Sequence, residues 1–199
     1  MIMSAPKNLR EVFVPLCTPD EFTEILMDHL DVYVDFPKKG IHFVDVFPVF
    51  RNRYLMDHMT SAFKRAIEEV KSLDTVTAIA APESRGFCFG MLVAQALGVP
   101  FIPFRKAGKL PCEVIATSYD LEYGSATLEF PKGVLTARDH VMIVDDLLAV
   151  GGTMKAMIDT IEKQTEASVH SGVTLINLAD LPKPAFSVPV VSILDLKDL

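Results

Sequence analysis

The chain has 199 residues, of which 50% are hydrophobic and 23% are charged, and its formal net charge is −7. This profile is that of an ordinary globular protein with about one domain. An acidic chain is poorly suited to bind nucleic acid or an anionic membrane surface, so we expect neither as a partner. The segment 1–11 lacks the apolar core of a signal peptide, and three cysteines cannot form an even disulfide set. A reducing, cytoplasmic location is therefore expected.

The N-terminal part is predicted to be helical. A helix should begin at Thr18 and run to about Leu30, because a capping residue, a proline and a capping-box acid stand in order before an apolar helical pattern. The turn-rich stretch 35–40 follows. We expect an N-terminal helical segment over residues 1–34 and the main domain over 35–199.

Extended and helical patterns alternate in the main domain from about residue 75 to 164. This alternation predicts an α/β fold, with a doubly wound, mainly parallel sheet flanked by helices. Further helices are predicted over 55–70, 86–97 and from 153 to about 164, and strands over 76–81, 101–104, 141–144, 173–178 and 188–194.

The turn after the strand 76–81 is a candidate anion site. Glu83, Ser84 and Arg85 precede a glycine and a predicted helix start. Backbone N–H groups at such a turn can hold an anion. A purely structural turn with a surface arginine is the alternative.

Residues 105–133 interrupt the alternation. They are polar and contain several glycines and prolines, so the segment is either a long functional loop or regular structure that this pattern does not reveal. Arg105 and Lys109 lie in a short cationic run at its start, where a closing loop could stabilise phosphate, although such a run is often only a solvated face. The segments 119–123 and 126–130 could pair as a hairpin around the dipeptide Gly-Ser that begins at 124.

The most informative segment follows the strand 141–144. Asp145 and Asp146 stand where this buried strand should end, and unpaired carboxylates are too costly to bury deeply. They should therefore lie at the carboxyl edge of the sheet, where open α/β sheets bind ligands. With no basic partner nearby in the sequence, they are expected to serve a ligand rather than a salt bridge.

A glycine pair and a helix start come next. Gly151 and Gly152 allow close approach of a ligand, and Thr153 could cap the following helix. The free N–H groups and positive dipole end of such a helix attract phosphate. Together with the two acids, this turn predicts a site for a ribose phosphate, and a tight turn with surface acids is the alternative.

The segment 144–153 resembles the phosphoribosyl pyrophosphate motif of type I phosphoribosyltransferases. Four further segments, 35–40, 83–90, 105–111 and 118–124, resemble those of the adenine phosphoribosyltransferases in that family, and they occur in the same order. The resemblance implies the type I phosphoribosyltransferase fold, with a small hood from about 35–50 and 177–199 and a flexible loop with a hairpin over 105–133.

The resemblance also implies a reaction. Adenine and phosphoribosyl pyrophosphate would give AMP and pyrophosphate, in purine salvage, with substrate-bound Mg²⁺ and in a homodimer. Asp145 and Asp146 would face the ribose hydroxyls and help to hold Mg²⁺, mostly through substrate and water. The 5′-phosphate would be bound by Ala149, Val150, Gly151, Gly152 and Thr153.

The resemblance assigns the remaining roles as follows. Glu83, Ser84 and Arg85 would form the pyrophosphate loop, which in this family often contains a cis peptide bond that does not precede proline. Adenine would be bound by Arg85, Ile41, His42, Asn177 and Leu178. Glu122 would handle the proton on the adenine ring, while Lys109 and Arg105, the latter supplied by the partner subunit, would stabilise the leaving pyrophosphate.

One position departs from the family pattern. Val150 stands where threonine is usual, so a hydroxyl that could donate to the 5′-phosphate is missing, and weaker binding of phosphoribosyl pyrophosphate is expected.

Two alternatives stay open: transfer to another purine base, and a regulator that binds phosphoribosyl pyrophosphate without catalysis.

Overall fold

The computed structural model describes residues 19–121 and 124–197. Its helices are α1 (Pro19–Met27), α2 (Arg53–Glu68), α3 (Arg85–Leu97) and α4 (Gly152–Gln164), with short 3-10 turns at Phe47–Arg51 and Leu73–Thr75. Its strands are β1 (Asp31–Val34), β2 (His42–Asp45), β3 (Ala78–Pro82), β4 (Phe101–Lys106), β5 (Val114–Leu121), β6 (Gly124–Pro131), β7 (His140–Leu148), β8 (Ser168–Leu178) and β9 (Val190–Leu196). None of the helices in these ranges is long and apolar enough to cross a membrane.

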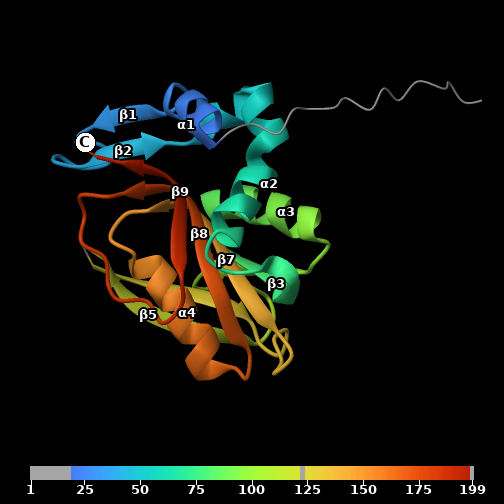
Figure 1. The fold of residues 1–199 in the computed structure, drawn as a ribbon. Helices are drawn as coiled ribbons and strands as arrows, with labels where there is room; N and C mark the ends of the chain where they lie inside the picture. The colour runs from blue at the N-terminus through green and yellow to red at the C-terminus, as the bar shows by residue number, and fades with distance from the viewer. Residues whose placement is uncertain (1–18, 122–123, 198–199) are drawn as a thin grey trace, which may run out of the picture.

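A seven-stranded sheet organises the described residues, with strand order β5-β6-β4-β3-β7-β8-β9 (Figure 1). The strands β4, β3, β7, β8 and β9 run parallel to one another, whereas β6 pairs antiparallel with both β4 and β5. The predicted doubly wound, mainly parallel α/β fold is confirmed.

The sheet has an apolar core on each face. In β7, Met142 and Val144 belong to the core under α2 and α3, whereas Val141 and Ile143 belong to the core under α4. All four side chains are fully buried, as the continuous apolar run in the sequence predicted. The two faces are covered by helices on opposite sides (Figure 1).

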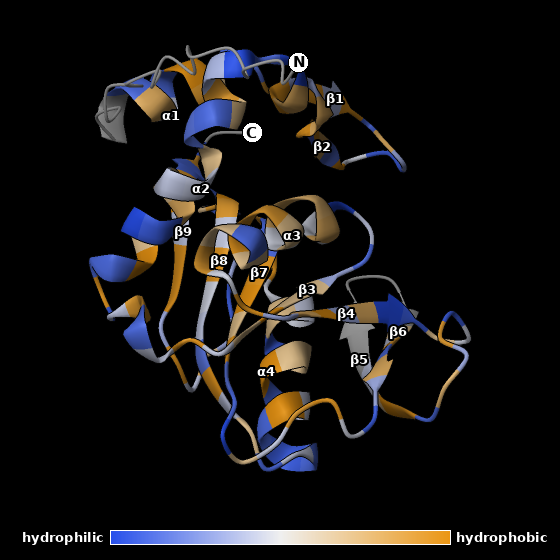
Figure 2. Cartoon of the chain, turned by 90° about the vertical axis from the view of Figure 1, so that its right-hand side faces the viewer, coloured by the Kyte–Doolittle hydropathy of each residue, from blue (hydrophilic) through white to orange (hydrophobic). Residues whose placement is uncertain are grey.

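A smaller unit stands at one end of the sheet. β1 and β2 form an antiparallel pair of their own, and Figure 2 shows this hairpin with α1 at the end of the molecule. β1 was not predicted from the sequence, so the described part of the segment 1–34 contains a strand as well as a helix. The predicted helix start at Thr18 lies outside the described residues.

The segment 105–133 is mostly strand, and the hairpin expected within it is confirmed. β5 and β6 pair antiparallel over their whole length, and β6 also pairs with β4. Phe104 and Phe130 stack with ring centroids 4.6 Å apart, which anchors the hairpin to the sheet. Gly124 and Ser125, expected at the turn of this hairpin, instead belong to β6, where Gly124 pairs with Leu121. Flexibility of this segment stays a prediction.

α3 packs unusually close to the sheet. A Cβ atom at Gly90 would lie 2.7 Å from the Ala81 Cβ and 2.9 Å from a Phe101 ring carbon. Only glycine allows α3 to approach β3 and β4 this closely.

Gly90→Val should therefore destabilise the fold by about 1–3 kcal/mol through overpacking. This loss lowers Tm by roughly 2–4 °C per kcal/mol for a chain of this size. Met91→Val is the matched control, because Met91 is 53% exposed on the same helix. Thermal unfolding of both variants measures the difference, and equal Tm values would contradict the close packing.

Candidate active site

A cavity of about 560 Å³ lies at the carboxyl ends of β3 and β7. Its lining includes the turn after β3, the acids of β7 and the turn that opens α4. The sequence-predicted residues that line it are Glu83, Ser84, Arg85, Asp145, Asp146, Ala149, Val150, Gly151, Gly152 and Thr153. The fold thus brings together two turns that are far apart in the chain.

A second cavity of about 430 Å³ adjoins the first. Its walls are mostly apolar and come from β2, the turn after β7 and the ends of β8 and β9. The two cavities share Phe43, Arg85, Leu147, Ala149 and Val150. A ligand that spans both would therefore cross at Arg85. The resemblance implies phosphoribosyl pyrophosphate in the larger cavity and the base in the smaller one, so we call them the donor cavity and the base cavity.

The two acids lie inside β7 rather than after its end. The strand continues because β8 pairs with it as far as Leu148, whereas the pairing with β3 stops at Ile143. Asp145 and Asp146 therefore emerge beside the end of β3, where one neighbouring strand is absent. Their expected place at the carboxyl edge of the sheet is correct, although the predicted strand end is wrong.

Asp146 has a basic partner, contrary to expectation. The Arg85 Nε lies 2.8 Å from the Asp146 Oδ2, and the Asp146 side chain is only 6% exposed. The partner comes from the first residue of α3, far away in the sequence. Burial raises the pKa of the Asp146 carboxyl, and the Arg85 guanidinium opposes this shift.

Asp145 is the more perturbed acid. Burial, together with the negative charge of Asp146, holds the pKa of the Asp145 carboxyl well above its ordinary value. Its Oδ1 accepts a hydrogen bond from the Asp146 backbone N–H at 2.9 Å. A Cβ at Gly86 would lie 2.7 Å from the same oxygen, so α3 packs directly on this carboxylate.

The turn before α4 presents backbone donors. Gly151 is the N-cap residue, with a left-handed φ of 77°, and its carbonyl accepts the first helical hydrogen bond from Lys155 at 2.9 Å. Thr153 is inside the helix and does not cap it, contrary to prediction. The first N–H groups of a helix have no partners within it, and here Gly151, Gly152 and Thr153 all line the donor cavity.

Arg85 follows the turn after β3 and is held in place by several contacts. The Glu83–Ser84 peptide bond is cis, as the resemblance implied. The Arg85 Nη1 donates a hydrogen bond to the Val44 carbonyl at 3.3 Å, and its guanidinium lies 5.1 Å from the centre of the Phe43 ring. Arg85 is therefore held by β2, β7 and an aromatic ring at once.

Arg105 and Lys109, the predicted cations of the loop, do not line the donor cavity. The Arg105 Nε is 2.7 Å from the Glu83 Oε2, and its Nη1 donates to the Lys109 carbonyl at 3.0 Å. Lys109 is exposed, and the lysine that lines the cavity is Lys106. Glu122 lies outside the described residues.

Of the five residues expected to contact adenine, four line the base cavity, and they are Arg85, Ile41, His42 and Leu178. Asn177 does not, because neighbouring side chains in a strand point to opposite faces. Its Nδ2 donates to the Asp195 Oδ1 at 2.9 Å instead.

Several lining residues were missed in the sequence. Phe43 and Leu147 stand at the junction of the cavities, and Asp180 and Leu181 form a wall of the base cavity. No motif marks them, but Phe43 is an aromatic residue in the hood segment close to the expected Ile41.

Comparison with known proteins agrees with this geometry. Residues 50–195 match the family model of the phosphoribosyl transferase domain. The adenine phosphoribosyltransferase of Francisella philomiragia is 46% identical over 159 residues, which cover 79% of this chain and 89% of that protein.

Solved structures agree as well. That of adenine phosphoribosyltransferase from Saccharomyces cerevisiae has a TM-score of 0.79 at 37% identity, and that from Thermoanaerobacter pseudethanolicus 0.78 at 36%. Each match covers 87% of this chain and 99% of the other. The chain therefore belongs to the adenine phosphoribosyltransferase family.

Proposed function

We propose that this chain transfers the 5-phosphoribosyl group from phosphoribosyl pyrophosphate to adenine, giving AMP and pyrophosphate in purine salvage. The observation that carries the proposal is the pair of adjoining cavities that meet at Arg85. One offers phosphate-binding turns and acids, and the other offers an apolar slot. The yeast relative was crystallised with adenine and an imino-altritol bisphosphate, which supports the same division of the site.

The donor would lie along the donor cavity. Its 5′-phosphate would sit on the N–H groups at the start of α4, and its ribose hydroxyls would face Asp145 and Asp146. Its diphosphate would then reach the turn at Glu83 and Ser84, near Lys106. The ribose C1′ would lie at the junction, close to Arg85.

Mg²⁺ fits the chemistry of this donor set. Two carboxylates supply only part of the oxygen sphere that Mg²⁺ requires, so the ion would take its remaining ligands from the diphosphate and water. Bound there, it would neutralise charge on the leaving pyrophosphate.

The base would lie in the base cavity, with a ring nitrogen facing C1′. That nitrogen forms a bond to C1′ as the C1′–O bond to pyrophosphate breaks, and the electron pair of the broken bond leaves with pyrophosphate. The proton on the ring nitrogen must depart, and Glu122 is proposed to receive it. The apolar walls exclude water that would otherwise hydrolyse the donor.

A cytoplasmic homodimer is part of the proposal. Cys88 and Cys112 are exposed free thiols, which suit a reducing compartment. Val34 and Phe36, on and beside β1, are 66% and 52% exposed and offer an apolar surface for association. Because Arg105 is paired with Glu83, its action in a partner subunit would require this ion pair to break.

The function is tested by assaying the chain with phosphoribosyl pyrophosphate, Mg²⁺ and, in turn, adenine, hypoxanthine and guanine. We expect kcat/KM for adenine to exceed the other two by at least about 100-fold. Absence of turnover with adenine would rule out the proposal. Turnover with another purine would favour that base, and donor binding without turnover would favour a regulator.

Val150→Thr should tighten donor binding. Val150 lines both cavities, and a threonine hydroxyl there could donate to the 5′-phosphate. One such hydrogen bond contributes about 0.5–1.5 kcal/mol, so KM for phosphoribosyl pyrophosphate should fall by roughly 2- to 12-fold. KM for adenine should not change, and Val150→Ala serves as the control without a hydroxyl. An unchanged donor KM would contradict the missing-donor interpretation.

Asp145→Asn should stabilise the unliganded protein at pH 7 to 8. Because folding raises the pKa of Asp145, stability that is fully present below the unfolded-state pKa is lost as the pH rises from there through the raised folded-state pKa. A neutral side chain removes this cost, and each kcal/mol gained raises Tm by roughly 2–4 °C. The gain should vanish as the pH falls below the unfolded-state pKa of about 3.9.

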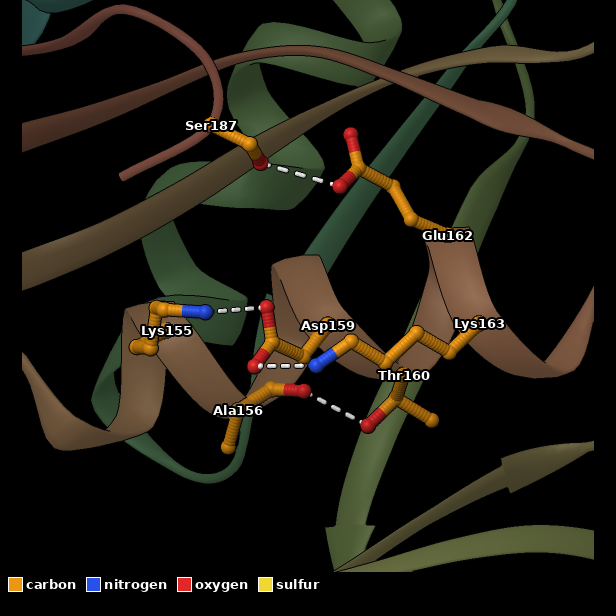
Figure 3. A network of polar contacts seen from close by, with 7 residues as sticks. All are labelled: Lys155, Ala156, Asp159, Thr160, Glu162, Lys163 and Ser187. Atoms are coloured by element: carbon orange, nitrogen blue, oxygen red, sulfur yellow. Dashed lines mark hydrogen bonds and ion pairs between the residues drawn. The ribbon is translucent and has the colours of Figure 1, made fainter. Parts of the chain in front are cut away.

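Asp159→Asn is the control of opposite sign. Although burial opposes the shift, hydrogen bonds from Lys155 and Lys163 hold the pKa of Asp159 below its ordinary value (Figure 3). Its ionised form therefore adds stability, so Asp159→Asn should lower Tm at pH 7. Thermal unfolding across pH measures both variants, and a lower Tm for Asp145→Asn at pH 7 would contradict the prediction.

A further inference from the structure

The segment 179–189 joins β8 to β9, and we call it the β8–β9 connection. At its beginning, Asp180 and Leu181 line the base cavity. Farther along, Pro184 and Phe186 pack on the phosphate turn, because a Cβ at Gly151 would lie 3.0 Å from an atom of each. One short segment therefore contacts the walls of both cavities.

Lys183 lies between these two ends. Its Nζ donates hydrogen bonds to the Leu178 carbonyl and, at 2.8 Å, to the Leu181 carbonyl. These two carbonyls flank the part of the chain that forms the base-cavity wall. Lys183 itself is half-buried and lines neither cavity. Its ammonium group thus holds the wall of the base cavity through these two backbone carbonyls, without lining the cavity.

The flanking residues stiffen this arrangement. Pro182 and Pro184 fix their own φ angles and keep the residues before them extended. Burial lowers the pKa of Lys183, whereas the carboxylates of Asp195 and Asp180 oppose this shift. The ammonium group therefore lies between local carboxylates and backbone carbonyls.

The other end of the connection is fixed independently of Lys183. The Ser187 Oγ donates to the Glu162 Oε2 at 2.9 Å, which ties the connection to α4 (Figure 3). The Pro189 carbonyl also accepts a hydrogen bond from the Gly172 N–H at 2.9 Å. Loss of Lys183 should therefore loosen the base-cavity end alone.

We propose that the β8–β9 connection positions both halves of the site, with Lys183 the positioning residue for the base cavity and Phe186 that for the phosphate turn. This inference rests on the proposed function for the identity of the two ligands. Neither side chain has to touch the reacting atoms. Their loss should therefore change KM much more than kcat.

The test compares Lys183→Met, Lys183→Arg and Phe186→Ala with the control Lys197→Met, which alters an exposed lysine close in sequence to the end of β9. Lys183→Met should raise KM for adenine about tenfold, because two charge-assisted hydrogen bonds to the wall are lost. KM for phosphoribosyl pyrophosphate and kcat should stay within about twofold. Lys183→Arg should restore part of the loss, because it keeps charged donors.

Phe186→Ala should show the reverse pattern, with a higher KM for phosphoribosyl pyrophosphate and little change for adenine. An unchanged adenine KM in Lys183→Met would overturn the proposal. A lower kcat with higher KM values for both substrates, together with a lower Tm, would also overturn the proposal, since these changes indicate a general structural role.

Calorimetric binding of AMP and of ribose 5-phosphate separates this inference from the proposed function. Lys183→Met should weaken AMP about tenfold and leave ribose 5-phosphate within about twofold, whereas Phe186→Ala should weaken both equally. If the wild type binds both ligands and the two variants change this binding as expected, but the wild type turns over no base, only the proposed function fails. Equal effects of Lys183→Met on the two ligands would refute the positioning role alone.

Discussion

The ion pair between Arg85 and Asp146 is the contact on which the rest of the site depends. A nearly buried carboxylate needs a cation, and here the cation is the first residue of a helix. That helix can deliver it only because Gly90 and Gly86 let α3 approach β3 and Asp145 closely. The same guanidinium lies at the Phe43 ring and donates to β2, so it also connects the small unit to the sheet. The packing of α3, the position of the two acids and the junction between the cavities therefore depend on one another.

This arrangement keeps the acids prepared for a ligand that brings its own charge. In the free protein, burial opposes the ionised form of Asp145, whose carboxylate lies beside that of Asp146. A polyhydroxyl ligand with a divalent cation would supply hydrogen-bond donors and positive charge at that position. Binding would then relieve an electrostatic cost that folding leaves in place, which is a common property of functional sites.

Much of the fold could be predicted because burial on both faces leaves an unmistakable pattern, as in the apolar run of β7. The two turns that line the donor cavity were also visible, since glycines and acids after a strand mark a place where a ligand can approach the backbone closely. Contacts between distant segments were not: nothing near Asp146 in the sequence points to Arg85, and nothing near Arg105 points to Glu83. The hairpin of β5 and β6 was predicted, but not its full length, because its polar strands depend on pairing with each other and on the packing of Phe130 against Phe104. Asn177 was misplaced because the alternation of β8 was not followed to its last residue.

The β8–β9 connection has a consequence for how such a site diverges. Its two ends contact cavities that we propose to bind different ligands, and only Pro182 and Lys183 separate them. An insertion or deletion that reshapes the slot for a new base would also shift the chain that packs on Gly151. Changes in base preference should therefore arise by point substitution on a connection of constant length, and lineages that altered its length should have had to re-evolve donor affinity as well.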